Sequence, residues 1–230
     1  MSILDEFGIR RGDVVSIVGA GGKTTLMFRL ANALRADGMR ILVTTTTKIH
    51  VPMRGQYDYM FIGADSVFPP PKPCICVLGA GINHRGKLTA PDAEDLRSLT
   101  KSFDVTLIEA DGARERLLKA WAAHEPDVPI FTTKTVAVFN LALLGKLPSE
   151  ETIHRLPIFL KLCELDEGEP ISFNALRKLL TKPDGILKGA TGCRILYINR
   201  VLDENSRREA IEFIESFTPD ELSRFDRIVI

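Results

Sequence analysis

A glycine-rich stretch near the N-terminus holds the residue types that bind a polyphosphate: Gly19, Ala20, Gly21, Gly22, Lys23, Thr24 and Thr25. Glycines let several backbone N–H groups face one anion, and a helix that begins there adds the positive end of its dipole. Lys23 could reach the β- and γ-phosphates, and the Thr24 hydroxyl could bind Mg²⁺. We therefore predict that this stretch binds the phosphates of a nucleotide and that Lys23 also acts in catalysis.

The stretch departs from the strict P-loop pattern G-x-x-x-x-G-K-[ST], because Ile17 stands where that pattern has glycine. A dinucleotide-binding fingerprint is one alternative, since Gly19 and Gly21 form G-x-G, but Thr24 occupies a position that needs glycine or alanine. A glycine turn without a ligand is another. A predicted strand before the stretch and a predicted helix after it favour phosphate binding. We expect Lys23 to lie on an exposed loop, so that Lys23→Ala abolishes triphosphate binding with little loss of folding.

Two acids directly follow the apolar run at 105–108, which is the end of a parallel strand where ligands bind. We predict that Asp111 joins Thr24 as a Mg²⁺ ligand. Glu109 is the candidate for orienting the attacking nucleophile. The alternative is that an acid here caps a neighbouring helix or loop.

A run of threonines, Thr44–Thr47, precedes Lys48 at the end of the second predicted strand. In the simplest topology this strand lies beside the strand that leads into the glycine-rich stretch. We predict that Thr45 and Thr47 bind phosphate-linked water or Mg²⁺ and that Lys48 balances phosphate charge. The alternative is that these β-branched residues only fill the strand end.

Basic residues follow the two acids along the chain. Arg114 is predicted to stabilise transition-state charge. Arg116 and Lys119 are predicted to bind an anionic second substrate, whose acceptor group would lie near His124 and Glu125. A solvated helix face is the alternative for this basic cluster.

The stretch that begins at Asn199 resembles the N-K-x-D signal with which guanine-specific proteins read the base. Arg200 replaces the lysine, and Asp203 comes one residue late. We therefore predict that Asn199 contacts a base, without a decision between adenine and guanine. His50 and His154 have no partner in the sequence and are expected to be surface or packed histidines.

The elements that must position these residues alternate along the chain. Short apolar runs predict strands at 14–18, 41–43, 59–62, 75–78, 105–108, 135–140, 194–199 and 227–230. Helical spacing predicts helices between the glycine-rich stretch and Gly38, and at 91–101, 149–163 and 172–181. Capping boxes predict two more helices, one at 207–216 after Ser206 and a short one after Thr218. This alternation predicts a mostly parallel α/β sheet in a single domain over residues 1–230, with a helical insertion or subdomain at 148–190.

Composition excludes several classes of protein. The 230 residues are 45% apolar and 26% charged, and thirty basic residues cancel thirty acidic ones. No overall positive field is left to gather nucleic acid or membrane lipid, and no apolar run reaches the ~18–20 residues that cross a bilayer. Acids near the start argue against a secretory signal, and four cysteines do not make a disulfide framework in a chain of this length. We expect a cytoplasmic protein in which Cys74 and Cys76 are thiols rather than metal ligands.

Four sequence segments together resemble one known family. The segments GAGGKTT, TTTTKI, EADGA and KAWAAHEPDVP, with similar later stretches, resemble the YqeC-like family of selenium-dependent molybdenum hydroxylase accessory proteins. The resemblance implies a nucleotide-binding α/β fold and a role in maturing such a hydroxylase. It assigns functions to the same phosphate loop, threonine strand and acidic motif, and to the His124-Glu125-Pro126 stretch. Trp121 stands where the family tends to have proline, and Arg200 where it tends to have lysine.

Together these patterns predict a P-loop NTPase-like three-layer α/β fold and a Mg²⁺-dependent protein that binds ATP or GTP. It would be an NTPase or a small-molecule phosphotransferase, with a molybdenum hydroxylase, its cofactor or a selenium precursor as partner. A nucleotide-gated chaperone or carrier with little turnover is one alternative, and a dinucleotide-binding oxidoreductase is another.

Overall fold

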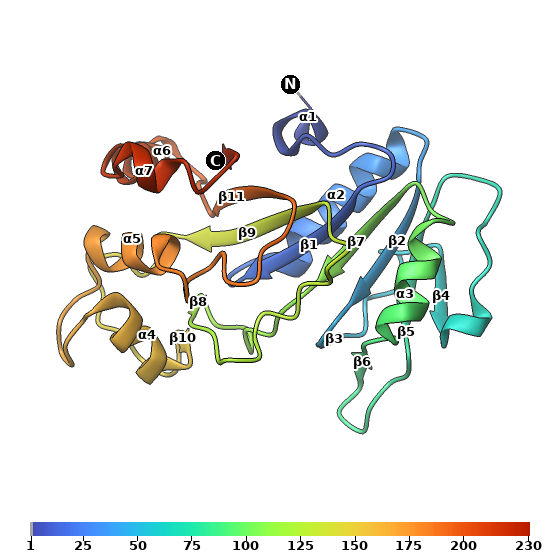
Figure 1. Ribbon diagram of the computed structural model, residues 1–230, viewed down its shortest axis with the longest axis horizontal. Helices are drawn as coiled ribbons and strands as arrows, with labels where there is room; N and C mark the ends of the chain where they lie inside the picture. The colour runs from blue at the N-terminus through green and yellow to red at the C-terminus, as the bar shows by residue number, and fades with distance from the viewer. Residues whose placement is uncertain (1) are drawn as a thin grey trace.

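Eight parallel strands form the central sheet of the computed structural model, which describes residues 2–230 (Figure 1). The order across the sheet is β12-β11-β9-β1-β7-β2-β5-β4. The bounds of these strands are β1 Val14–Gly19, β2 Arg40–Thr45, β4 Tyr59–Ile62, β5 Cys74–Gly79, β7 Val105–Glu109, β9 Lys134–Asn140, β11 Cys193–Asn199 and β12 Arg227–Val229. Each predicted strand is therefore present, to within one or two residues at its ends.

The inner strands are continuous apolar runs because both of their faces are buried. Along β1, Val15 and Ile17 pack into one hydrophobic cluster, and Val14 and Val18 pack into the other. Successive side chains of a strand point to opposite faces, so one short run supplies both cores. The strand thereby holds its carboxyl end, where the glycine-rich stretch begins, in a fixed position.

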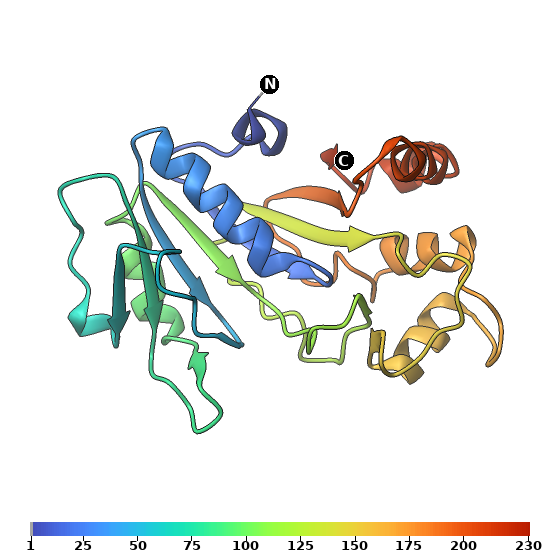
Figure 2. The same cartoon turned by 180° about the vertical axis from the view of Figure 1, so that it is seen from behind.

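Helices cover both faces of the sheet. Leu30 of α2 packs into one cluster, whereas Leu96 of α3 and Phe213 of α6 pack into the other. Figure 2 shows α2 lying across the face opposite α3. The predicted three-layer α/β fold is confirmed. The helices are α1 Ile3–Phe7, α2 Lys23–Ala36, α3 Ala93–Thr100, α4 Leu156–Cys163, α5 Phe173–Thr181, α6 Glu204–Glu215 and α7 Pro219–Leu222, with a 3₁₀ turn, η1, at Ala64–Ser66.

The strand order differs from the simplest topology. β7 lies between β1 and β2, pairing Ile17 with Glu109 on one side and Thr45 with Glu109 on the other. The threonine strand is therefore one strand farther from the glycine-rich stretch than predicted. β1 lies where the connections diverge: the chain leaves β1 toward β2 on one side, and it leaves the neighbouring strand β9 toward β11 on the other side. Ligands of open α/β sheets bind outside the strand ends at such a point.

Two predicted helices begin elsewhere than expected. α6 begins at Glu204 because Asp203, not Ser206, is its N-cap: the Asp203 carboxylate accepts from the Ser206 N–H at 2.7 Å. Only Leu156–Cys163 of the predicted helix at 149–163 is helical. Before it, β10 (Ile153–His154) pairs with β8 (Leu118–Lys119), which takes these residues out of the helix. Tertiary pairing thus overrides local helical spacing here.

The segment predicted as a helical insertion, 148–190, contains α4 and α5. Phe159 of α4 and Leu176 of α5 belong to the same hydrophobic cluster as Phe139 of β9. A second small sheet pairs β3 (Lys48–His50) with β6 (Lys87–Thr89) in antiparallel fashion. Within residues 2–230, no helix is long and apolar enough to cross a membrane.

Candidate functional site

The glycine-rich stretch connects β1 to α2 with a backbone that only glycine fits. Gly19 has φ +95°, and a Cβ there would lie 2.1 Å from the Val138 carbonyl oxygen. Gly22, the N-cap of α2, has φ +138°, and its Cβ would lie 2.2 Å from Asn199 Nδ2. These left-handed conformations turn the chain sharply into the helix. The close approach of Gly19 to Val138 of β9 and of Gly22 to Asn199 of β11 fixes the position of the loop.

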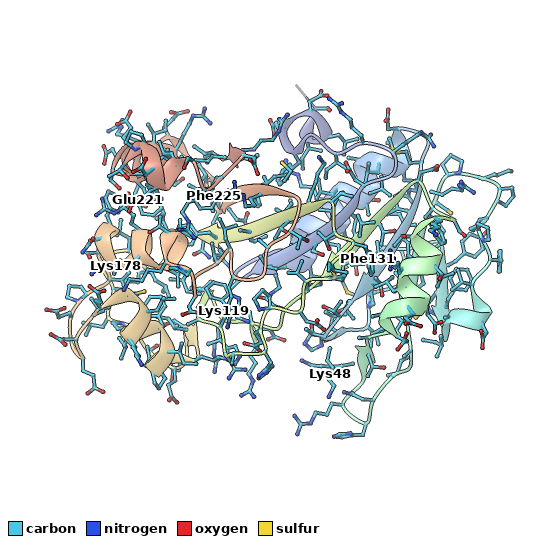
Figure 3. All side chains as sticks on the ribbon, in the orientation of Figure 1. Lys48, Lys119, Phe131, Lys178, Glu221 and Phe225 are labelled. Carbon is cyan, nitrogen blue, oxygen red and sulfur yellow. The ribbon has the colours of Figure 1, made fainter. Side chains whose placement is uncertain are left out.

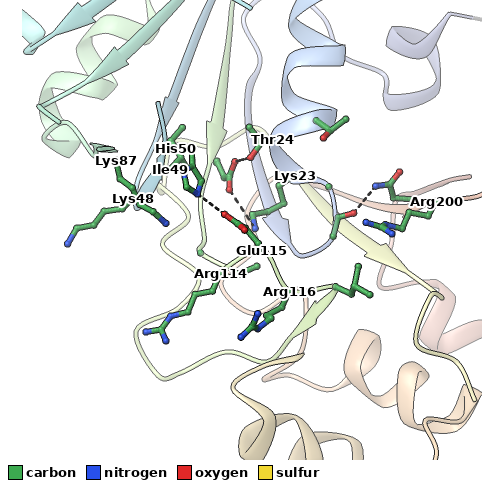
Figure 4. A pocket seen from close by; sticks show the side chains of 18 residues that line it. Lys23, Thr24, Lys48, Ile49, His50, Lys87, Arg114, Glu115, Arg116 and Arg200 are labelled. Carbon is green, nitrogen blue, oxygen red and sulfur yellow. Dashed lines mark hydrogen bonds and ion pairs between the residues drawn. The ribbon is translucent and has the colours of Figure 1, made fainter. Parts of the chain in front are cut away.

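A cavity of about 530 Å³ opens in front of this loop; we call it the loop cavity (Figure 4). Six basic side chains line it and only two acids do, so its field is positive. Figure 4 shows Lys48, from β3, and Arg114 and Arg116, from the segment between β7 and β8, extending around its open side. The lining basic residues are Lys23, Lys48, Lys87, Arg114, Arg116 and Arg200, and the acids are Glu109 and Glu115.

Glu109, at the end of β7, contacts the first turn of α2. The Thr24 hydroxyl donates a hydrogen bond of 2.6 Å to Glu109 Oε2, and both residues line the loop cavity. A hydroxyl and a carboxylate in contact at the start of a helix are oxygen donors of the kind that Mg²⁺ takes together with substrate phosphates. Glu109, rather than Asp111, is therefore the acid that the fold brings to Thr24.

Asp111 is fully buried and holds the base of the loop. Its Oδ2 accepts from the Gly19 N–H at 3.1 Å and from Trp121 Nε1 at 2.8 Å. Its carboxylate also lies 3.2 Å from Lys23 Nζ and 3.3 Å from Lys119 Nζ. A buried carboxylate needs such partners because an unpaired charge away from water is very costly. The geometry differs from the predicted metal ligand: Asp111 contacts the loop backbone and two lysines instead of Thr24.

Lys23 is buried, which corrects the expectation of an exposed loop. Only 5% of it is accessible, and its Nζ donates to the Gly19 carbonyl at 2.9 Å. Burial works to lower the pKa of Lys23, but the charges of Asp111 and Glu109 outweigh burial and raise it. The lysine is therefore charged at neutral pH, and its removal would also disturb the charges around Asp111.

Lys119 is also inside the protein. Its Nζ donates to the Gly112 carbonyl at 2.7 Å and lies between the carboxylates of Asp111 and Glu125, at 3.3 and 3.5 Å. Burial is the main cause that lowers its pKa. Lys119 does not line the loop cavity, in contrast to Arg114 and Arg116. It forms buried ion pairs with Asp111 and Glu125 instead of facing a substrate.

Some of the other predicted site residues line the loop cavity, and others form hydrogen bonds that hold the surrounding backbone. Thr25 lines the loop cavity, and Ala20 is buried. The Thr45 hydroxyl donates to the Glu109 carbonyl at 2.8 Å, inside the sheet. Asn199 donates to the Gly21 carbonyl at 2.8 Å, so its amide holds the loop at the cavity edge. His124 is exposed and does not line the cavity.

A second cavity of about 510 Å³ adjoins the first. The Arg155 guanidinium makes two hydrogen bonds of 2.9 Å to the Glu125 carboxylate in its wall. Burial alone would raise the pKa of Glu125, but these bonds and the charge of Lys119 lower it to about 2. The lining residues are Thr46, Thr47, Lys48, Thr89, Ala90, Gly112, Arg114, Glu125, His154 and Arg155.

Comparison with known proteins identifies the family. The model of the family described as YqeC protein matches residues 15–157. The chain belongs to the YqeC family. A relative from Escherichia coli (strain K12), "Uncharacterized protein YqeC", is 34% identical over 205 residues, which cover 86% of this chain and 80% of the relative. No solved structure gives a significant match.

The YqeC-family match covers the loop, the acids and the basic segment, yet the sequence does not show how several other residues reach the two cavities. Arg155 and His154 reach the site because β10 pairs with β8, and no spacing in the sequence reveals that pairing. Glu115 enters the wall with His50, whose Nε2 lies 2.7 Å from its carboxylate (Figure 4). Arg200 lines the loop cavity beside Asn199, a position that its departure from the base-reading motif does not reveal. Lys87 reaches the wall through the pairing of β6 with β3.

Strained backbone gathers at the same two cavities of this YqeC-family protein. Five non-glycine residues within 2–230 have positive φ, and four of them line a cavity: Arg114, Glu115, Arg155 and Arg200. A left-handed conformation costs roughly 1–3 kcal/mol at such a residue and persists only where its surroundings enforce it. Three of these four residues are basic, and the concentration of the strain at the two cavities fits a functional surface.

We expect His154 to make this YqeC-family protein less stable in acid. Burial, followed by the charges of Lys119 and Arg155, lowers its pKa to about 4. Below an unfolded pKa of about 6.5 the unfolded chain takes up a proton that the folded protein does not, so stability falls as the pH drops toward 4. We expect a loss of roughly 1 kcal/mol between about pH 7 and pH 5, after allowance for partial exposure. Urea unfolding at both pH values measures it.

His154→Gln is the control, because it removes the titrating ring while Glu125 keeps its own pKa below this range. The variant should lose most of the difference between the two pH values. An unchanged difference would show that another group causes it.

Proposed function

We propose that this YqeC-family protein binds a nucleoside triphosphate, ATP or GTP, with Mg²⁺ in the loop cavity and hydrolyses or transfers the terminal phosphoryl group. The observation that carries the proposal is the glycine-built start of α2, which opens into a cavity lined by six basic side chains. Backbone N–H groups at a helix N-terminus and surrounding cations are what a polyphosphate requires.

The residues at the loop fit a magnesium ion. Thr24 and Glu109 supply a hydroxyl and a carboxylate in contact. No group of three or more His, Cys, Asp or Glu side chains within residues 2–230 forms a metal site by itself. This suits Mg²⁺, which keeps waters and binds through one or two protein oxygens and the phosphates. When bound, the ion would neutralise phosphate charge; we assign it to Thr24 and Glu109 rather than to Asp111.

The chain's own residues then have distinct roles in the proposed reaction. The loop N–H groups hold the phosphates. Lys23 exchanges its contact with Asp111 for a phosphate oxygen and remains charged in both arrangements. Arg114 and Arg116 stabilise the charge that develops on the transferred group. Positioning and electrostatics of this kind suffice for phosphoryl transfer.

A nucleotide-gated carrier is the second candidate, favoured by the contact between Lys23 and Asp111. Because Asp111 also binds Gly19 and Trp121, a phosphate that draws Lys23 away changes the balance of charges at the base of the loop. A ligand that prefers one of two arrangements shifts their populations, which is the basis of a switch. In this case turnover is slow and binding is the functional event.

The biological role that we propose follows from the resemblance that the sequence carries. It is an accessory role, in the cytoplasm, in the maturation of a selenium-dependent molybdenum hydroxylase. The partner would be that enzyme, its cofactor or a selenium precursor. The proposal includes no nucleic acid and no membrane among the partners.

A panel of thermal unfolding measurements tests the proposed function. ATP and GTP should raise the melting temperature with Mg²⁺ present, whereas NAD and NADP should not; a ligand at 100 times its Kd adds about 2.7 kcal/mol of stability. Lys23→Gln should lose this shift, measured from the variant's own melting temperature because the substitution also disturbs Asp111. Lys146→Gln, at an exposed site outside both cavities, is the matched control.

Three outcomes separate the alternatives. Phosphate release that rises with an added acceptor supports the enzyme, and tight binding without release supports the carrier. A shift by NAD or NADP alone supports the oxidoreductase. An unchanged nucleotide shift in Lys23→Gln contradicts the assignment of the loop.

A further inference from the structure

The second cavity shares a wall with the loop cavity. Lys48, Gly112 and Arg114 line both, so a molecule in one cavity lies next to a molecule in the other. Its volume of about 510 Å³ is in the range that holds a small metabolite. Figure 3 shows Lys48, which lines both cavities, at the lower edge of the molecule next to β6.

The uncompensated charge in this wall is positive. Glu125 is fully paired, with two hydrogen bonds from Arg155 and with Lys119 at 3.5 Å. Lys48 and Arg114 form no ion pair with any residue in 2–230 and extend into open space (Figure 4). An anion that enters therefore meets two free cations and no free carboxylate.

The remaining polar groups of the wall are acceptors. The Thr46 hydroxyl donates its proton to the Asp127 carbonyl at 2.7 Å, and the Thr89 hydroxyl donates to the Gly81 carbonyl at 3.1 Å. Their oxygen lone pairs stay available for donors on a ligand. The pKa of His154, lowered to about 4, leaves a neutral ring with one acceptor nitrogen at neutral pH.

We propose that the second cavity binds a small anion that carries hydroxyl groups, beside the triphosphate. The anionic group lies against Lys48 and Arg114, and the hydroxyls donate to Thr46, Thr89 and His154. A phosphate ester of a sugar and a hydroxycarboxylate share this chemistry. The inference rests on the proposed function in one respect, since it makes this anion the neighbour and second ligand of the bound nucleotide.

Calorimetric titration into protein already loaded with Mg²⁺ and a non-hydrolysable triphosphate analogue tests the proposal. The probes are ribose 5-phosphate and gluconate, which distinguish a phosphate from a carboxylate, and inorganic phosphate, which has the charge alone. We expect at least one hydroxylated probe to bind the loaded protein about tenfold more tightly than inorganic phosphate. If neither binds, or if the analogue and the probe displace each other, the proposal is wrong.

Two variants assign the binding to one cavity. Ala90 lines only the second cavity, so Ala90→Trp should fill it and weaken probe binding about tenfold or more, with nucleotide affinity unchanged. Lys87 lines only the loop cavity, so Lys87→Ala should weaken nucleotide binding and leave probe binding unchanged. Thr46→Val, which removes one acceptor, replaces Ala90→Trp if that variant does not fold by circular dichroism.

The failures are distinguishable. Probe binding that Ala90→Trp does not weaken overturns the assignment to this cavity. A protein that binds no nucleotide but still binds a probe, sensitive to Ala90→Trp, keeps the second site and contradicts the proposed function.

Discussion

Asp111→Asn should lower the free energy of unfolding by about 3–5 kcal/mol, the usual cost of removing one partner from a buried ion pair. The carboxylate is 0% accessible and lies 3.2 Å from Lys23 Nζ and 3.3 Å from Lys119 Nζ. An amide of the same shape keeps an acceptor for Trp121 but leaves two lysine charges without their common counter-charge. Urea unfolding at neutral pH measures the change.

Asp127→Asn is the control, because Asp127 is exposed and its side chain makes no hydrogen bond or ion pair within residues 2–230. Its stability should stay close to that of the parent. A stable Asp111→Asn protein that has lost only its response to Mg²⁺ would contradict the structural role and restore Asp111 as a metal ligand.

Glu109→Gln should cost less stability than Asp111→Asn, because Lys23 Nζ loses an acid at 3.7 Å but keeps Asp111 at 3.2 Å, and it should remove the effect of Mg²⁺. Glutamine can still accept the Thr24 hydroxyl hydrogen bond, so the start of α2 keeps its contact. It lacks the negative charge that attracts the ion, and it cannot act as a base. We expect the Mg²⁺-dependent part of the nucleotide-induced melting shift to disappear, and phosphate release to fall roughly 100-fold or more where turnover is present.

Glu115→Gln is a matched control in the same cavity, since Glu115 contacts His50 rather than Thr24. It should retain the response to Mg²⁺. Equal effects of the two substitutions would mean that the acids act only through the total charge of the cavity. An unchanged Mg²⁺ response in Glu109→Gln would overturn its assignment to the metal.

The sequence predicts the elements of the fold well because buried parallel strands are short apolar runs with clear ends. The strand at 59–62 has the predicted bounds, and the α/β class follows from the alternation of elements. The position of β7 between β1 and β2 could not be predicted, since each of these strands is apolar on both faces and accepts either neighbour.

The candidate site was predictable as a set of residues but not as an arrangement. The pair Glu109 and Asp111 was visible in the sequence, yet the path of the chain after β7 decides which acid meets Thr24 and which enters the interior. Lysine is usually a surface residue, so the sequence does not reveal that Lys119 is buried. Its burial is possible only because Asp111 and Glu125 surround its charge. His154 reaches the site through β10.

The contact between Trp121 Nε1 and Asp111, at 2.8 Å, has a practical consequence. Trp121 is the single tryptophan of the chain, and Lys23 Nζ lies on the other oxygen of the same carboxylate. The tryptophan fluorescence of this protein therefore originates one side chain away from the lysine that a phosphate would draw outward. The indole is a built-in optical probe of the loop, and titrations can be followed on the unlabelled chain.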